Sequence, residues 1–137
     1  VPIMLCDKKR DVVAAVHAGW RGTAGKIVEQ TIALLMSEFH SDPTDFVAFI
    51  GPSASSCCYN VGTEVADQFA EEFVRHDDGR LFLDLKKANA AQLIHAGVPK
   101  TSIEVSSLCT ISEASLLHSY RREKEQSGRM MAVIGLV

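Results

Sequence analysis

The chain has 137 residues, 47% of them hydrophobic and 23% charged, with a formal net charge of −3. This length and balance fit one compact domain, residues 1–137, and exclude a disordered chain. The negative charge excludes a basic nucleic-acid surface, and no apolar run reaches the roughly 18–20 residues of a transmembrane helix. The four cysteines follow no disulfide framework, since Cys57 and Cys58 are adjacent, so we expect free thiols in a cytoplasmic protein.

The first half of the chain alternates apolar runs with one long amphipathic segment. Residues 3–5 predict a strand and residues 7–11 a charged turn. Residues 12–18 predict a second strand whose two faces are both covered, because polar residues do not alternate along it. Residues 23–39 carry apolar side chains at three- and four-residue spacing and predict a helix. Residues 46–50 predict a third strand.

The second half mixes short elements with loops. Residues 53–60 form a small-residue loop, and Gly62-Thr63 offers an N-cap for a helix marked by Val65, Phe69 and Phe73. Residues 76–79 predict a turn, residues 81–85 a strand, and Asp84 the cap of a helix that extends through Ala96. Residues 103–105 and 130–137 predict strands, with mostly loop or a short helix over 108–128. Mixed elements of this kind predict an α+β fold around a largely buried sheet.

The two ends of the chain are abrupt. Residues 1–5 read as the middle of an apolar strand, and residues 130–137 end in an apolar run without a polar tail. Domains usually begin with a polar, frayed segment. We therefore expect one incomplete domain that is truncated at its N-terminus.

The heptapeptide HAGWRGT at residues 17–23 concentrates the chemistry of the chain at a strand-to-helix turn. Glycines let a helix start with exposed amides, which favour an anion, and Arg21 adds forked donors. A phosphate or carboxylate site is one interpretation, and a tight connection with a surface arginine is the other. His17 is likewise either a packed histidine or a metal ligand, and a ligand would need two or three partners.

Two other loops carry reactive groups. Cys57 or Cys58 could act as a nucleophile with His17 as its base, or both could simply fill a tight corner. Tyr120, Arg121 and Arg122 lie together in a later loop, and consecutive side chains such as those of Arg121 and Arg122 point in different directions in most backbones. One of these arginines can therefore face a site.

Seven sets of residues in order give the chain a specific resemblance: HAGWRGT 17–23, IGP 50–52, CCY 57–59 with VG 61–62, LDL 83–85, CT 109–110, SYRR 119–122 and GRM 128–130. Together they resemble the YfiH/YlmD-type family, long described as multicopper polyphenol oxidases or laccases. The resemblance implies a layered α/β/β/α sandwich with a mixed sheet. It also implies zinc-dependent phosphorolysis of adenosine, inosine, guanosine and methylthioadenosine, with adenosine deamination.

The resemblance assigns roles to particular residues. The family's zinc is held by an upstream His, by a Cys that would directly precede Val1, and by the His of the HAGWRG turn, which corresponds to His17. His17 and Arg21 are the predicted catalytic residues, with nucleoside and phosphate as partners. The predicted substrate or phosphate contacts are a wider set: Gly19, Gly22, Thr23, Tyr120, Arg121 and Arg122. The chain departs from the family at Asn60, where many members carry Glu, and at His118, where Phe is usual.

Two other activities stay open. A copper-dependent polyphenol oxidase would need many histidine ligands, and this chain has five scattered histidines without a His-x-His pair. A cysteine hydrolase would use Cys57 or Cys58. The oligomeric state does not follow from the sequence.

Overall fold

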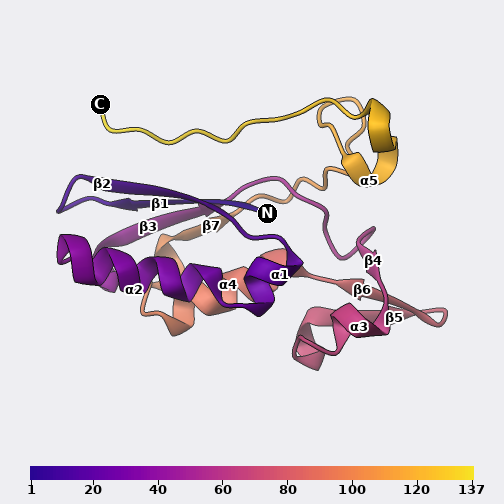
Figure 1. Ribbon diagram of the computed structural model, residues 1–137, viewed down its shortest axis with the longest axis horizontal. Helices are drawn as coiled ribbons and strands as arrows, with labels where there is room; N and C mark the ends of the chain where they lie inside the picture. Colours follow the sequence, from indigo (N-terminus) through magenta and orange to yellow (C-terminus); the bar gives the residue numbers. More distant parts are fainter.

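A four-stranded mixed sheet forms the centre of the protein, whose computed structural model describes all 137 residues (Figure 1). Its strand order is β2-β1-β3-β7. The central strand β1 pairs antiparallel with β2 and with β3, whereas β3 pairs parallel with β7. The bounds of these strands are β1 Pro2–Asp7, β2 Val12–His17, β3 Phe46–Ile50 and β7 Ile103–Val105. The mixed sheet with helices confirms the predicted α+β class.

Two helices, α2 (Ile27–Phe39) and α4 (Leu85–His95), pack against one face of this sheet (Figure 1). Alternate residues of β1 and β3 point toward them, which follows from the two-residue period of a strand. The cap that Asp84 was predicted to provide is confirmed, because its carboxylate accepts a hydrogen bond from the N–H of Lys87 at 2.9 Å. The main core is apolar and comprises Ile3, Leu5, Val16, Ala18, Val28, Ile32, Leu35, Phe46, Ala48, Ile50, Leu93 and Val98.

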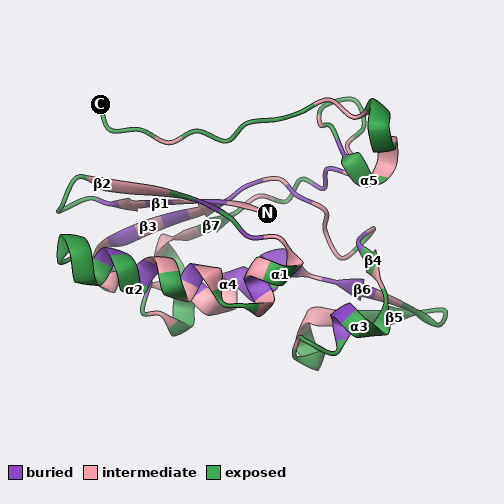
Figure 2. Ribbon diagram, in the orientation of Figure 1, coloured by how far each residue is buried: buried purple, intermediate pink, exposed green.

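The other face of the sheet is less covered (Figure 2). Ala15 and His17 of β2 are exposed, and Met4 and Phe49 on β1 and β3 are only half-buried. The prediction that both faces of residues 12–18 are covered is therefore wrong. The absence of polar alternation reflects the apolar side chains of Val13 and Ala15 on the sparsely covered outer face rather than two layers of packing.

The predicted helix over residues 23–39 is two helices. Helix α1 (Trp20–Ala24) is a short turn, and α2 starts only at Ile27. Lys26 between them has a left-handed backbone with φ of 57°, which ends one helix and re-aims the next. The apolar period continues across this break because α1 and α2 bury neighbouring faces. The sequence pattern therefore did not reveal it.

A smaller antiparallel sheet, β4-β6-β5, lies beside the main one (Figure 1). It contains β4 (Asn60–Val61), β5 (Val74–Asp77) and β6 (Arg80–Leu83). Asp78 and Gly79 join β5 to β6 with φ angles of 47° and 69°, as a two-residue hairpin turn requires. The helix predicted at residues 65–73 is only one turn, α3 (Thr63–Ala66), followed by a 3-10 turn, η2 (Glu71–Phe73). Strand β5 was not predicted.

The segment 108–128 is mainly loop, as predicted. It contains a one-turn helix, α5 (Tyr120–Glu123), and a 3-10 turn, η4 (Lys124–Gln126). Two further 3-10 turns lie earlier in the chain: η1 (Pro43–Asp45) precedes β3, and η3 (Lys100–Ser102) precedes β7. The strand predicted at residues 130–137 is wrong, because that segment has no strand partner and its side chains are mostly exposed. No helix has the length and apolar character needed to cross a membrane.

Candidate functional site

The HAGWRGT turn places His17 at the edge of the main sheet. His17 is the last residue of β2 and pairs with Pro2, and its side chain is exposed. Gly19 adopts an extended backbone and precedes α1, whose first N–H groups have no partner within the helix. The structure therefore places an exposed imidazole next to the free amides of the turn. The interpretation of His17 as a packed core histidine is wrong.

A cavity of about 540 Å³ opens over His17. The facing wall comes from the segment around α5, more than a hundred residues further along the chain. This wall supplies a second imidazole, a phenol and a guanidinium, and the full lining is His17, His118, Tyr120, Ser127, Gly128, Arg129 and Met130. We call it the His17 cavity. Its lining carries imidazole, hydroxyl and guanidinium groups and no carboxylate, so it can take an anionic or polar ligand.

A second cavity, of about 360 Å³, lies beside the same turn. Trp20 lines one side and Arg121 another, and the remaining lining is Tyr59, Asn60, Val61, Gly62, Glu64 and Val65. We call it the Arg121 cavity. Consecutive residues of α5, Tyr120 and Arg121, thus face two different cavities next to one strand-to-helix turn.

Two arginines near this turn are stacked on aromatic rings. The guanidinium of Arg21 lies 4.2 Å from the centre of the Trp20 ring, and that of Arg121 lies 4.8 Å from the Tyr59 ring. Arg121 also donates a hydrogen bond to the carbonyl oxygen of Asn60 at 2.9 Å. Stacking holds the plane of a guanidinium while its edge stays available to a carboxylate or phosphate.

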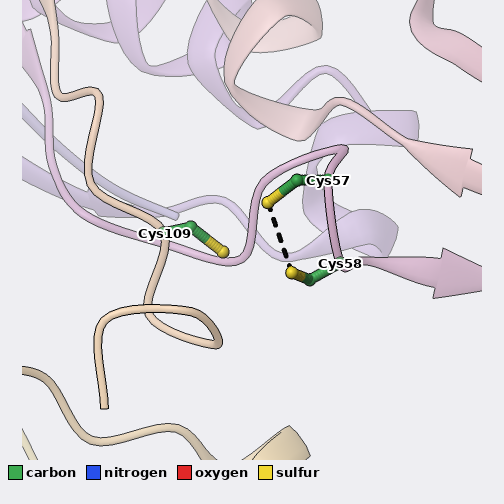
Figure 3. Close-up of side chains that lie close together, drawn as sticks. All are labelled: Cys57, Cys58 and Cys109. Carbon is green, nitrogen blue, oxygen red and sulfur yellow. Dashed lines mark hydrogen bonds between the residues drawn. The ribbon is translucent and has the colours of Figure 1, made fainter.

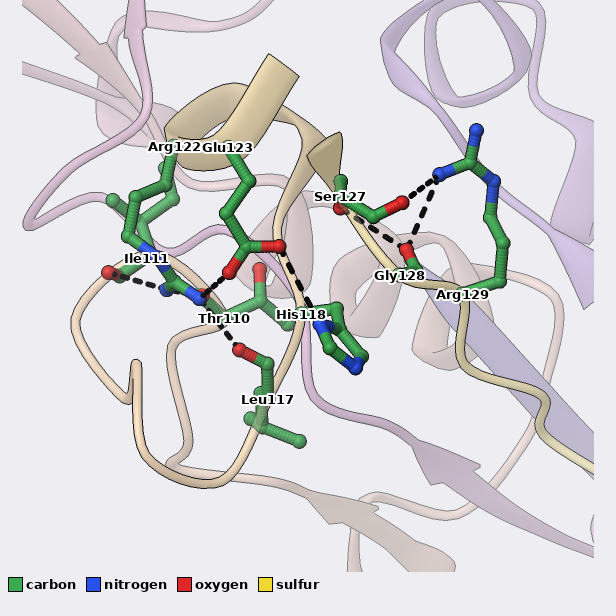
Figure 4. Close-up of polar contacts among 9 residues, drawn as sticks. All are labelled: Thr110, Ile111, Leu117, His118, Arg122, Glu123, Ser127, Gly128 and Arg129. Carbon is green, nitrogen blue, oxygen red and sulfur yellow. Dashed lines mark hydrogen bonds and ion pairs between the residues drawn. The ribbon is translucent and has the colours of Figure 1, made fainter. Parts of the chain in front are cut away.

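The neighbouring Arg122 has a different role (Figure 4). Its guanidinium donates to the carbonyl oxygens of Thr110, Ile111 and Leu117 at 2.6, 2.9 and 2.7 Å, and it pairs with Glu123. The hydrogen bond from Arg122 lowers the pKa of Glu123 to about 2. Arg122 therefore holds the loop together, and Arg121 is the member of the pair that faces a cavity.

Glu123 also fixes His118. Its carboxylate lies 3.4 Å from Nδ1 of His118, whose ring packs against Gly128 (Figure 4). A Cβ at position 128 would come within 2.5 Å of the imidazole, so only glycine allows this close approach. Neither His118 nor Arg129 was predicted from the sequence as a site residue. The GRM motif was the available signal, because its glycine and arginine both line the His17 cavity.

Thr23 and Gly22 lie in helix packing. Thr23 is 1% exposed, and its hydroxyl donates to the carbonyl of Gly19 at 3.0 Å and accepts from the amide of Asn89 at 3.0 Å. Gly22 lies close to Ile27, with 3.4 Å from an ideal Cβ to Cγ2 of that residue. Neither residue lines the His17 cavity or the Arg121 cavity, so the fold places both behind the turn.

The residues present do not make a three-ligand zinc site at His17. The His17 cavity contains one further imidazole, His118, but neither a cysteine nor a carboxylate lines it. The one group of three or more potential metal ligands in the chain is elsewhere, at Cys57, Cys58 and Cys109. A zinc ion bound by His17 would need ligands from outside these residues.

The three cysteines converge from two loops (Figure 3). Their Sγ atoms all lie within 4.8 Å of one another, and those of Cys57 and Cys58 are 3.3 Å apart. Desolvation and the neighbouring sulfur atoms raise the pKa of Cys57 to about 12. Burial opposes ionisation of Cys109, but N–H groups led by that of Ser55 stabilise its thiolate more, so its pKa falls to about 6.

All four cysteines are free thiols. No cysteine lines the His17 cavity, so the cysteine-hydrolase interpretation lacks its proposed base. The raised pKa of Cys57 also removes the thiolate that such a nucleophile needs. Together the fold and the site define a small α+β protein with a basic, aromatic-flanked site at a strand-to-helix turn.

Comparison with known proteins assigns the chain to a family. Residues 1–137 match the family described as multi-copper polyphenol oxidoreductase laccase, and the chain belongs to this family, which includes YfiH and YlmD. It is 39% identical to "Purine nucleoside phosphorylase YlmD" of Geobacillus stearothermophilus, over 98% of this chain and 52% of that protein. It is 41% identical to "Purine nucleoside phosphorylase" of Deinococcus radiodurans, over 98% of this chain and 53% of that protein.

The fold agrees with this relationship. The crystal structure of YlmD from Geobacillus stearothermophilus superposes with a TM-score of 0.86 at 38% identity, over 93% of this chain and 50% of that one. The crystal structure of YfiH from Bacillus licheniformis gives a TM-score of 0.83 at 39% identity, over 88% of this chain and 48% of that one. The chain thus spans about half the length of the relatives it matches.

Proposed function

We propose that this chain forms part of a zinc-dependent purine nucleoside phosphorylase acting on adenosine, inosine, guanosine and methylthioadenosine. The observation that carries the proposal is the basic site at the HAGWRGT turn, within a chain that matches relatives named as such phosphorylases over 98% of its length. Zinc, when bound, would supply a Lewis acid. His17 would be one ligand, and the Cys and His ligands would belong to sequence outside these 137 residues.

Phosphorolysis joins a phosphate oxygen to the anomeric carbon of the ribose while the bond from that carbon to the purine nitrogen breaks. The proton of hydrogen phosphate ends on the released purine, so the products are the free base and ribose 1-phosphate. The main demands on the protein are to hold the phosphate dianion and to orient the sugar toward it. We assign the first demand to Arg121, which lines the Arg121 cavity, and to Arg21, which lines neither cavity but stacks on Trp20 of that lining. Forked donors of this kind bind phosphate in two-point contacts.

One aromatic residue meets the second demand, the orientation of the sugar. In the proposal, Tyr120 contacts the nucleoside from the wall of the His17 cavity, where its hydroxyl donates to Glu125 at 3.0 Å. Trp20 and Tyr59 act indirectly, because each one fixes the plane of the arginine stacked on it. The amides after Gly19 add donors at the turn.

A paired substitution tests the phosphate role. Arg21→Gln should raise the KM for phosphate. The assay measures the cleavage of inosine through the hypoxanthine that is released. Arg10→Gln, in the turn at the opposite end of the β1-β2 hairpin from His17, removes an equal charge away from the His17 and Arg121 cavities and is the control. Equal phosphate KM values for both variants and the unsubstituted protein would remove Arg21 from the site.

Adenosine deamination is the second proposed activity, and it rests on the family resemblance alone. Conversion of adenosine to inosine in phosphate-free buffer would support it. If adenosine yields only adenine, and only when phosphate is present, the protein is a phosphorylase without deaminase activity.

A copper polyphenol oxidase is the alternative that the family description names. In this chain His17 and His118 are the two histidines that share a cavity, which falls short of a multicopper cluster. Stoichiometric copper together with oxygen-dependent oxidation of a phenol would establish that activity instead.

A further inference from the structure

The loop after β3 and the loop after β7 meet at three thiols outside the proposed nucleoside site. A parallel bridge between Ser53 and Cys109 joins the loops, and the N–H of Thr110 donates to the carbonyl of Ser53 at 3.1 Å. A tight turn then brings the chain back, because the N–H groups of Cys58 and Tyr59 both bond the carbonyl of Ser55. These contacts hold the three sulfur atoms near one point from two separate loops (Figure 3).

The spacing of the sulfur atoms suits one metal ion. With metal–sulfur bonds of about 2.3 Å, thiolates that share an ion stand about 4 Å apart. The Sγ atoms of Cys57, Cys58 and Cys109 span this value, from 3.3 Å for the adjacent pair to an upper limit of 4.8 Å. Cys109 is buried, Cys58 is half-buried and Cys57 is exposed, so a fourth coordination position would face solvent beside Cys57.

A disulfide fits the adjacent pair less well. Consecutive Cα atoms lie about 3.8 Å apart, which is shorter than the roughly 4.4–6.8 Å found across disulfides. Three converging thiols also leave one thiol unused by any single disulfide. Metal coordination uses all three.

A buried cation balances the charge of such a site. Lys86 of α4 is 6% exposed, and its ammonium donates at 2.8 Å to the carbonyl oxygens of Ser106 and Leu108, the latter directly preceding Cys109. Three thiolates and a divalent ion carry one net negative charge, which this ammonium neutralises. With a monovalent ion the site would keep a second negative charge.

We propose that Cys57, Cys58 and Cys109 form a binding site for one divalent thiophilic ion of the zinc class, separate from His17. Binding displaces each remaining thiol proton to solvent and forms three metal–sulfur bonds, with no change in oxidation state. Thiolate ligands select zinc-class and copper(I) ions over hard cations. The ion cross-links the two loops that lead to Tyr59 and Arg121, so it braces the Arg121 cavity without entering it.

Metal counting on the full chain tests the proposal. The reduced protein is loaded with Zn²⁺, passed over a desalting column and assayed for zinc and protein, and Co²⁺ is used as a spectroscopic substitute. We expect one ion per chain and a sulfur-to-cobalt charge-transfer band. Cys57→Ser changes an exposed position and should not affect packing. Loss of a residue that only contacts a metal ligand weakens metal binding by about 10- to 100-fold, and Cys57→Ser should weaken zinc binding by more than this.

Two controls separate this site from other binding. Cys6→Ser removes the half-buried thiol of β1 and should leave the zinc content unchanged. In the 137-residue chain, which does not include the other ligands proposed for a zinc ion at His17, His17→Ala should also leave it unchanged, so that a failed phosphorylase proposal does not affect this one. Cys109→Ser should abolish the cobalt band in a protein whose circular dichroism shows a native fold.

Several results would overturn the site. These are a reduced protein that retains no zinc, a Cys57→Ser variant that binds as tightly as the parent, and a Cys6→Ser variant that loses as much. Retention of Cu⁺ without Zn²⁺ would also contradict a divalent site. So would a Cys109 disulfide that forms in the presence of excess Zn²⁺.

Discussion

Thr23 offers the sharpest test of how packing and binding divide within the HAGWRGT turn. Its hydroxyl accepts one N–H of Asn89, a fully buried residue whose other amide N–H donates to the carbonyl of Leu85 at 2.7 Å. Thr23→Val keeps the β-branched shape but leaves that N–H of Asn89 buried without an acceptor. A buried polar group left without a partner costs about 1–3 kcal/mol.

A loss of about 2 kcal/mol corresponds to a fall in Tm of roughly 6–8 °C for a domain of this size, at about 3–4 °C per kcal/mol. Scanning calorimetry and urea unfolding measure it, with the exposed Thr101→Val as the control expected to change Tm by less than about 1 °C. The KM for phosphate should not change. An unchanged Tm with a raised phosphate KM would show instead that Thr23 binds substrate, as the motif alone suggested.

Three further predictions concern other parts of the structure. Arg121→Gln should lower kcat/KM for phosphorolysis by about 10- to 100-fold without lowering Tm, because a charge-assisted contact contributes about 1.5–3 kcal/mol; a matching loss of Tm would show that the residue is structural. Arg122→Met should open the 108–128 loop to limited proteolysis, since three carbonyl oxygens lose their donor, and unchanged cleavage rates would contradict that role. Asp7 is buried, and although burial opposes ionisation, the nearby Ser41 hydroxyl and the N–H groups of Lys9 and Arg10, which donate to its Oδ1 at 2.8 and 3.1 Å, hold its pKa below the usual 3.8. Its stabilisation is therefore present at neutral pH and is lost as pH falls through the lowered pKa, so the free energy of unfolding of Asp7→Asn should vary less than that of the parent between pH 6 and pH 3; parallel pH profiles would contradict this assignment.

The sequence predicted elements best where the local signal and the packing agree. The Asp84 cap and the apolar residues of β1 and β3 follow simple rules, and both are as expected. The break at Lys26 was hidden, because one left-handed residue leaves no compositional mark. The exposed face of β2 was also missed, since alanine at position 15 reads as buried although no helix covers it.

The candidate site shows a similar division. The HAGWRGT motif located the turn, but which side chains face a cavity depends on contacts across more than a hundred residues. Arg121 and Arg122 are indistinguishable in sequence, and only the acceptors around Arg122 separate their roles. The thiol cluster could not be predicted from the sequence, because it forms where two loops meet and Cys109 lies 51 residues beyond Cys58 in the chain.

The most direct test of the account is the phosphate-dependent cleavage of inosine by the protein that contains this chain, with and without His17→Ala. The parent protein should release hypoxanthine and ribose 1-phosphate in equal amounts, and only when phosphate is present. His17→Ala should lose nearly all of this activity at an unchanged Tm, because the exposed imidazole makes no core contact. Full activity of the folded His17→Ala protein would contradict the central claim that the HAGWRGT turn is the reaction site.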